Sequence, residues 1–308
     1  MNFLTALLNS MPGAVAQGLI WGIMAIGVYI TFRVLDVADL TVDGSIATGG
    51  AVAVMLIRGG CDVWTALICA FLAGMLAGMV TGFLHTACGI PAILAGILTQ
   101  LSLYSVNLRI MGMANQALSV DKYSLLVSQR YVRAMDFTNP LIPLCAAVVL
   151  LIAALYWFFG TELGCSLRAT GSNENMARAQ GINTNFNKIL GLMLSNGLVA
   201  LAGALLSQYQ GFADVKMGQG AIVIGLAAVI IGEVIFGRVF RNFALKLLSV
   251  SLGAVIYYMV IQIVLRMGLN TDDLKLLTAL VVALFLAIPY WKGRYFRAKV
   301  KMGGEENA

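Results

Sequence analysis

The stretch AVAQGLIWGIMAIGVYITF, residues 14–32, carries no charged side chain and is long enough to cross a membrane as a helix. Crossing about 30 Å of hydrocarbon takes roughly 20 apolar residues. Further apolar stretches follow, at Gly44 to Ile57, Trp64 to Leu84, Ile90 to Ile110, Leu141 to Phe159, Asn187 to Ser207, Gly218 to Phe236, Phe243 to Leu265 and Lys275 to Tyr290. The pattern predicts an all-α polytopic membrane protein with about nine transmembrane segments.

The composition supports this prediction. Of the 308 residues 60% are hydrophobic and 11% are charged, and the mean hydropathy is +0.89. A soluble domain carries about a quarter charged residues, so most of this chain lacks a water-facing surface. We therefore expect one transmembrane domain over residues 1–308.

The first residues do not have the pattern of a cleavable signal peptide, because no Lys or Arg precedes the apolar run. Phe3, Leu4, Leu7 and Leu8 lie at helical spacing. Residues 1–13 are therefore expected to form a helix lying in the membrane interface, or equally an extension of the first span.

The sequence predicts no catalytic, metal or cofactor site. The five cysteines (Cys61, Cys69, Cys88, Cys145 and Cys165) form no CxxC pair and are expected to be small apolar side chains. The single histidine, His85, cannot build a metal site by itself. Neither an HExxH motif nor a GxxxxGK[ST] phosphate loop occurs, so the chain is predicted not to be an enzyme.

The second apolar stretch is too short to cross the membrane unaided. Its lead-in, Asp36 to Gly44, includes Asp39 and Asp43 close to membrane depth. Irregular backbone at that depth must line protein or a water-filled cavity. We expect a half-helix preceded by a non-helical turn around Asp39 to Gly44, with Asp39, Asp43 and Gly44 as turn residues.

A short internal match suggests a repeat. Residues 38–42, ADLTV, resemble residues 213–217, ADVKM, and each is followed, twelve residues after its Ala, by a glycine, Gly50 or Gly225. The match predicts inverted halves over residues 14–110 and 187–291, joined by a span at residues 141–159. Ala213 to Gly220, with Asp214, would be the counterpart turn. Inverted repeats with interrupted helices recur in transport proteins.

Basic residues predict the orientation. The tail, residues 292–308, carries Lys292, Arg294, Arg297, Lys299 and Lys301, which places it in the cytoplasm. Counting spans back from the tail puts the loop at residues 160–186 on the same side and the N-terminus outside.

That loop contains the most specific stretch, TELGCSLRATGSNENMARAQGINT, residues 161–184. Asn173 can cap a helix, Glu174 puts negative charge in its first turn, and Arg178 falls in its last turn. Gly181 is suited to the left-handed residue that ends it. The predicted helix, Asn173 to Gln180, is too short to be stable alone and needs support from a partner.

Residues 168–183, RATGSNENMARAQGIN, resemble a loop of the form RAxGxNxxxARxxGI in permeases of ATP-binding-cassette (ABC) importers of the branched-chain amino acid and ribose type. In that family the loop forms a coupling helix that docks in a cleft of the ATPase subunit. The resemblance implies coupling roles for Ser172, Asn173, Glu174, Asn175, Met176, Ala177, Arg178 and Gly181.

The resemblance extends to residues 25–45 and 211–237. DLTVDG and LYSVNLRIMGMAN are similar to a subgroup whose binding proteins include some for tryptophan-like amino acids. Many relatives have a glycine-rich end to the seventh span, where this chain has Gly232-Glu233-Val234. The resemblance implies that the chain is the permease subunit of an importer for a small solute, with an amino acid as the first choice.

The implied partners are a second permease copy, an extracytoplasmic binding protein and two ATPase subunits that carry ATP and magnesium. The implied location is the bacterial cytoplasmic membrane, with the lipid bilayer as solvent and no nucleic acid bound.

Polar side chains inside two spans leave two interpretations open. Gln100, Tyr104 and Asn107 fall on one helical face, with Ser105 beside them, and the sixth span adds the pair Ser195 and Asn196. They could line a translocation pathway. Alternatively, they could form hydrogen bonds between helices.

The alternative function is an ion-coupled secondary transporter. Such a transporter would need ionisable residues in mid-membrane, whereas Asp39, Asp43, Asp214 and Glu233 lie nearer predicted span ends. It would also not need the loop at residues 160–186.

Overall fold

The computed structural model describes residues 3–123, 125–132, 139–237 and 239–266, together with 276, 278–280, 282–284 and 287. The helices are α1 (Phe3–Tyr29), α2 (Val42–Arg58), α3 (Val63–Thr86), α4 (Ala92–Met111), α5 (Leu141–Gly160), α6 (Glu162–Ser172), α7 (Glu174–Ala179), α8 (Thr184–Gln210), α9 (Ala221–Phe236) and α10 (Phe243–Arg266). Shorter elements are the π-helical turn η1 (Ile30–Val34), the 3-10 turn η2 (Gln129–Tyr131) and the strands β1 (Asn115–Ala117) and β2 (Phe212–Asp214).

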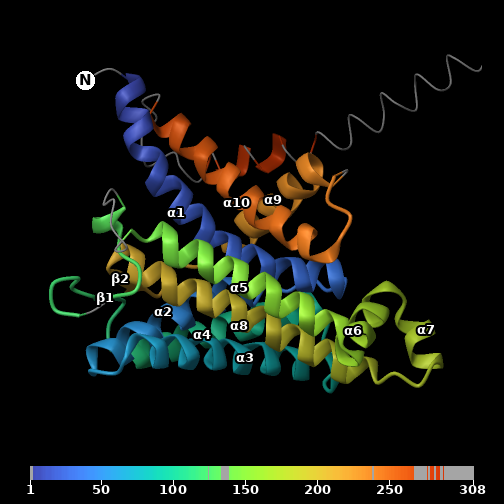
Figure 1. The fold of residues 1–308 in the computed structure, drawn as a ribbon. Helices are drawn as coiled ribbons and strands as arrows, with labels where there is room; N and C mark the ends of the chain where they lie inside the picture. Colours follow the sequence, from blue (N-terminus) through green and yellow to red (C-terminus); the bar gives the residue numbers. More distant parts are fainter. Residues whose placement is uncertain are drawn as a thin grey trace, which may run out of the picture.

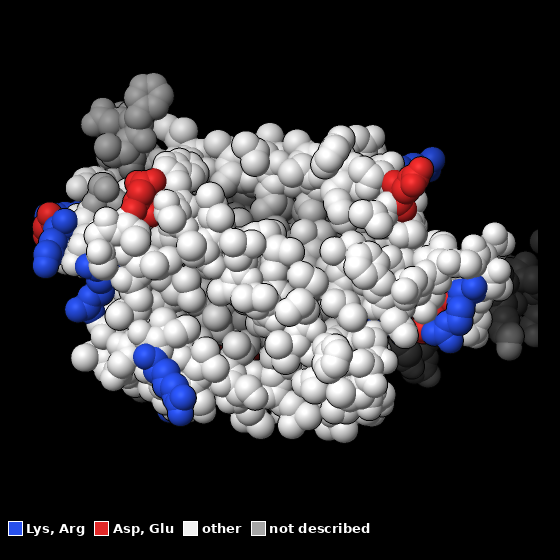
Figure 2. All heavy atoms as spheres, turned by 90° about the horizontal axis from the view of Figure 1, so that it is seen from below, with Lys and Arg blue, Asp and Glu red and all other residues white. Residues whose placement is uncertain are grey.

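Six described helices are long and apolar enough to cross a membrane, and α9 is a shorter apolar helix. The six spans are Ser10–Val34, Val63–Thr86, Ala92–Met111, Leu141–Gly160, Thr184–Gln210 and Phe243–Arg266. On the face in Figure 2, charged side chains lie toward the two ends and leave an uncharged surface between them. The helical membrane class is confirmed, whereas the count of nine stays a prediction, since Lys275 to Tyr290 lies largely outside the described residues.

Helix α8 occupies the centre of the bundle and packs against α1, α2 and α3 (Figure 1). Small residues allow the close approach: a Cβ at Gly74 of α3 would collide with the carbonyl oxygen of Asn196, and one at Gly78 with that of Leu192. Gly74 and Gly78 therefore let α3 and α8 meet backbone to backbone, as is common between membrane helices. A second group forms where α1 packs on α10 and α10 on α9.

Residues 3–13 form the first turns of α1, continuous with the first span, in place of a separate interfacial helix. Pro12 lies inside this helix without ending it. The hydroxyl of Tyr209 donates a hydrogen bond to the carbonyl oxygen of Gly13 at 3.3 Å, which ties this turn to α8. Of the two interpretations that the sequence allowed, the N-terminal segment thus follows the second, an extension of the first span.

Both predicted interruptions are present. After η1 the chain leaves the helix, Asp36 adopts a left-handed conformation (φ 56°), and α2 begins at Val42. The first turn therefore lies a few residues earlier than expected, and Asp43 and Gly44 belong to the first turn of α2. In the second half, β2 and a turn separate α8 from α9, so Ala213 to Gly220 is non-helical. The inverted relation of the two halves stays a prediction.

The two chain segments after α4 and α8 are joined by a small antiparallel pairing. Asn115 pairs with Asp214, Gln116 with Ala213, and Ala117 with Phe212. This ribbon lies at the end of the bundle opposite to α6 and α7 (Figure 1).

Candidate functional site

The first interruption is fixed by a buried carboxylate. Asp39 accepts hydrogen bonds from the backbone N–H of Thr41 at 2.9 Å and from the side-chain amide of Asn196 at 2.7 Å. Asn196 in turn accepts a bond from the hydroxyl of Ser45 at 2.6 Å. Because a buried polar group is costly without partners, this chain of bonds fixes the turn against α2 and α8.

The second interruption repeats one feature of the first. Asp214 accepts a hydrogen bond from the backbone N–H of Lys216 at 2.6 Å, two residues on, as Asp39 does from Thr41. The side-chain amide of Asn115 also donates to Asp214, at 3.4 Å. Aspartate is favoured at such positions because its short side chain bonds the following backbone.

Asp43 connects the two interruptions. Its carboxylate accepts bonds from the backbone N–H groups of Gly220 at 2.9 Å and Ile222 at 3.0 Å, at the start of α9. Next to it, Gly44 lies against α4, where an added Cβ would stand 3.0 Å from Leu103 and 3.1 Å from the Cα of Gln100. The turn residues thus hold α2, α4 and α9 together.

At the other end of the bundle, the short helix predicted at Asn173 to Gln180 is confirmed as α7. The side chain of Asn173 accepts a hydrogen bond from the N–H of Met176 at 3.0 Å, and Gly181 has a φ of 81°. Glu174 bonds Arg178 at 2.9 Å within the helix and Lys188 of α8 at 2.8 Å.

Helix α6, directly before α7, was missed by the sequence analysis. The side chain of Thr161 accepts a bond from the N–H of Gly164 at 3.4 Å, and Glu162 lies in the first turn. A threonine followed by an acidic residue was the available signal for this helix start. Residues 161–184 therefore contain two helices, and the polar loop is more ordered than expected.

The implied coupling residues do not all face outward. Ser172, Asn173, Asn175, Met176 and Arg178 are exposed, with Met176 at 62%. Ala177 is only 3% exposed, so it packs inside the loop and is not available to a docked partner. Its neighbours Met176 and Arg178 are exposed. So short a helix is stable only if one of its faces packs against other parts of the protein, and Ala177 lies on that face.

Helix α6 rests directly on the end of the first span. Gly171 lies so close to the carbonyl oxygen of Val34 in η1 that an added Cβ would collide with it. Asn187 of α8 donates a hydrogen bond to the hydroxyl of Thr170 at 2.9 Å. The loop is therefore joined to the spans by close backbone packing and hydrogen bonds.

The predicted face of α4 divides between two environments. Asn107 is 1% exposed, and its side-chain oxygen has no hydrogen-bond partner among the described residues. Gln100 is half-buried, whereas Tyr104 is 43% exposed and Ser105 is exposed. The buried arc of α4 runs through Thr99, Leu103 and Asn107. Tyr104 lies beyond the edge of that arc, on the outer surface of a single subunit.

Ser195 and Asn196 are fully buried and bonded within the bundle. The hydroxyl of Ser195 donates to the carbonyl oxygen of Gly27 at 2.8 Å, and Asn196 makes the bonds to Asp39 and Ser45. The sequence left two interpretations open for both residues, a pathway lining or hydrogen bonds between helices. The contacts seen here are hydrogen bonds within the bundle, as in the second interpretation.

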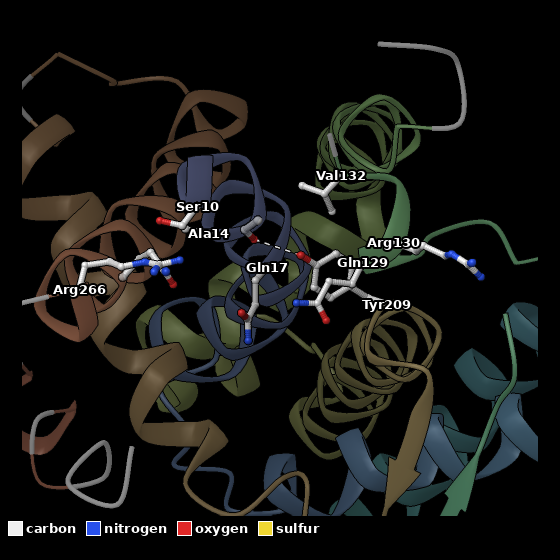
Figure 3. A pocket seen from close by; sticks show the side chains of 10 residues that line it. Ser10, Ala14, Gln17, Gln129, Arg130, Val132, Tyr209 and Arg266 are labelled. Carbon is white, nitrogen blue, oxygen red and sulfur yellow. Dashed lines mark hydrogen bonds between the residues drawn. The ribbon is translucent and has the colours of Figure 1, made fainter. Parts of the chain in front are cut away.

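A polar cavity of about 440 Å³ lies near the start of α1 and the end of α8 (Figure 3). Its polar lining comes from Ser10, Gln17, Gln129, Arg130, Tyr209, Gln262 and Arg266. Figure 3 shows Gln17 and Gln129 on facing sides, while Arg130 points away from the cavity. Its size lies within the range of small-molecule sites. Gln17 and Gln262 are amide side chains inside predicted spans. Gln100 was predicted as a pathway residue for the same reason, whereas Gln17 and Gln262 were missed.

Comparison with known proteins identifies the family. The family described as "Branched-chain amino acid transport system / permease component" matches residues 11–289. The chain is 39% identical over 280 residues to a tyrosine transport system permease protein of Clostridioides difficile (strain R20291), covering 91% of both chains. It is 36% identical over 282 residues to the uncharacterized protein RP368 of Rickettsia prowazekii (strain Madrid E), covering 91% of this chain and 98% of the relative.

A more distant relative is the autoinducer 2 import system permease protein LsrC of Yersinia pestis (strain Pestoides F). It is 31% identical over 216 residues, 69% of this chain and 58% of the relative. Among solved structures, PsaBC from Streptococcus pneumoniae in complex with Fab aligns with a TM-score of 0.40 at 21% identity, over 85% of this chain and 91% of that one. So distant a structural likeness carries no functional argument. The family match spans most of the chain, and this protein belongs to the branched-chain amino acid transport system permease family, as the integral membrane permease component of an ABC importer.

Proposed function

We propose that this permease imports an aromatic amino acid, taken from an extracytoplasmic binding protein and moved at the expense of ATP on separate ATPase subunits. The similarity to a tyrosine transport system permease over 91% of both chains is the observation that carries the proposal. We further propose that two copies of the chain and two ATPase subunits assemble in the bacterial cytoplasmic membrane. ATP and magnesium would then bind only on the partner.

The α6–α7 loop is the proposed contact with the ATPase. In this proposal ATP hydrolysis and the transport pathway lie on different chains. A compact element of the permease must therefore bind the ATPase and connect it to the spans. Met176 is largely exposed on α7, while Glu174 anchors that helix to Lys188 of α8. Ser172, Asn173, Asn175 and Arg178 supply polar groups around Met176. In this proposal the loop, and with it the C-terminal tail, lies on the cytoplasmic side.

The proposed pathway runs along α4 between two copies of the subunit. Tyr104 and Ser105 lie on the outer surface of one subunit, so a second wall must come from another chain. Gln100 and Asn107 line the inner edge of this face, and the side-chain oxygen of Asn107 accepts no hydrogen bond from the part of the chain that the structure describes. Neutral hydrogen-bonding groups with one aromatic ring suit a zwitterionic amino acid with an aromatic side chain.

The test is uptake into proteoliposomes that contain the permease, its ATPase and its binding protein. Labelled tyrosine and tryptophan should accumulate only with ATP, and leucine should compete poorly. Accumulation driven by a proton or sodium gradient without the ATPase would instead support the secondary transporter. Leucine transport equal to that of tyrosine would contradict the aromatic substrate while leaving the ABC permease intact.

The loop assignment needs its own variant. Met176→Asp should put an unpaired charge into the desolvated contact, at a cost of several kcal/mol, and so abolish ATPase co-purification and uptake together. Met113→Asp is the matched control, because Met113 is exposed to 57% beyond the end of α4, away from the loop. Normal assembly and uptake with Met176→Asp would overturn the loop assignment.

A further inference from the structure

A cationic cavity lies at the end of the bundle that carries α6 and α7. Its volume is about 520 Å³, and it lies between the end of α1, α6 and the start of α10. Tyr29, Arg33, Arg168, Ser172, Phe243 and Lys246 are among the residues that line it. The cavity therefore collects three basic side chains from three separate elements.

The charges in this cavity do not balance. Arg33 makes two bonds, at 2.8 and 2.9 Å, to the carboxylate of Glu233 at the end of α9. Arg168 lies 5.4 Å from the ring centre of Phe243. Neither Arg168 nor Lys246 has an acidic partner among the described residues. Two like charges facing one cavity repel each other, and an anion between them would remove that cost.

The surroundings show which anion fits. An adjoining cavity of about 630 Å³ shares Arg168 and Phe243 and extends to Tyr156 and Trp157 at the end of α5. Trp157 is 74% exposed, and α5 continues from it as an exposed apolar surface that includes Leu150. Tryptophan and tyrosine at a span end mark the membrane–water interface. The cations thus lie at headgroup depth, beside a surface suited to an acyl chain.

We propose that these two cavities hold an anionic phospholipid, with its phosphate between Arg168 and Lys246 and an acyl chain along the outer face of α5. Basic pockets between spans on the cytoplasmic side bind lipid headgroups in this way. The assignment to the cytoplasmic leaflet rests on the proposed function, which places α6–α7 on that side. A free phosphate ion would satisfy the same two cations but would leave the apolar surface of α5 unused.

The consequence is a lipid contact on the coupling loop itself. Arg168 belongs to α6, whose Gly171 packs on η1, while Lys246 belongs to α10. A phosphate held by both cations would bridge α6 and α10 across the cavity. The lipid would therefore hold the loop in place relative to the spans.

The test measures lipid binding to the purified permease by native mass spectrometry, with phosphatidylglycerol, phosphatidylcholine and inorganic phosphate as separate probes. Phosphatidylglycerol should bind tighter than phosphatidylcholine, and inorganic phosphate in millimolar excess should not displace it. Arg168→Gln and Lys246→Gln should each weaken phosphatidylglycerol binding about fivefold, and together about 25-fold. Equal affinity for the two lipids, or full displacement by phosphate, would overturn the proposal.

Two controls separate a lost site from lost folding. Arg109→Gln removes a cation from the last turn of α4, at the opposite end, and should leave the affinity within twofold. Arg168→Lys keeps the charge and should retain most of the phosphatidylglycerol binding. Loss of binding in this variant would reject a site based on charge. The assay uses neither ATP nor the ATPase, so failure of the coupling proposal would leave a positive lipid result standing.

Discussion

The carboxylate of Asp43, in the first turn of α2, accepts a hydrogen bond from the backbone N–H of Gly220 at 2.9 Å, although the two residues are 177 positions apart in the chain. Both α2 and α9 begin after an interruption, and each start carries the positive end of a helix dipole. One side chain thus neutralises two helix starts from opposite halves of the sequence.

Asp43→Ala should lower the stability of the permease by about 1–3 kcal/mol, because the N–H groups of Gly220 and Ile222 lose their acceptor in a partly buried site. Thermal unfolding in detergent, followed by circular dichroism, measures the loss. Asp43→Asn keeps an acceptor and should lose less. Asp62→Ala is the control, since Asp62 caps α3 through Trp64 at an exposed position and should cost about 1 kcal/mol or less. Equal losses at both positions would refute a special role for Asp43.

Cysteines along α4 test the proposed pathway. Tyr104→Cys and Gln100→Cys should react with a charged thiol reagent at rates that change when ATP is trapped on the ATPase, since the facing subunits move. Val106→Cys is the control, because its side chain is 44% exposed on the other side of the buried arc of α4 and should not respond to nucleotide. Rates at Tyr104 and Gln100 that match Val106 in every state would remove the lining assignment.

The anchoring of α7 should depend on pH through Glu174. Its hydrogen bond to Lys188 lowers the pKa of the Glu174 carboxyl below its ordinary value of about 4.5. A lowered pKa means that the bond stabilises α7 above the unfolded pKa and is lost as the pH falls through the folded pKa. Hydrogen exchange over residues 174–180 should therefore differ between wild type and Glu174→Gln at pH 7, and the two should converge only as the pH falls through the lowered folded pKa of Glu174. A difference that persists unchanged after the Glu174 carboxyl is protonated would show that the anchoring is not ionic.

The pair Arg33 and Glu233 joins the end of the first span to the end of α9. It should behave as a unit: Arg33→Gln and Glu233→Gln should each reduce ATP-driven uptake, and the double variant should lose less than the sum of the two. The charge-swapped variant, Arg33→Glu with Glu233→Arg, should recover part of the activity. Strict additivity would show that the pair is incidental.

The sequence allowed the six spans of the described residues, the two interruptions and the short helix α7 to be predicted, because each depends on local chemistry. Apolar length sets a span, Asp39 and Asp214 bond the backbone two residues on, and Asn173 and Gly181 bound a helix. The position of the first turn was wrong by a few residues, because α2 already begins at Val42 and so includes Asp43 and Gly44.

Other features depend on packing between distant segments and had no local signal. The burial of Ala177 follows from how α7 lies on the bundle, and the continuity of α1 through Pro12 accompanies a contact with Tyr209. The cationic cavity brings together Arg33, Arg168 and Lys246, which no spacing in the sequence connects. Such features come from the assembled structure alone.

The contact between Gly171 of α6 and the carbonyl oxygen of Val34 leaves no side chain between the two backbones. A joint without a compressible layer transmits displacement without slack, so a shift of α6 must move the end of α1 by nearly the same amount. The end of α1 is a π-helical turn, a departure from regular helix that is frequent at functional sites. A shift of α6 therefore reaches the first span where its helix is already irregular, and the methyl group added by Gly171→Ala would force the two backbones apart at that point.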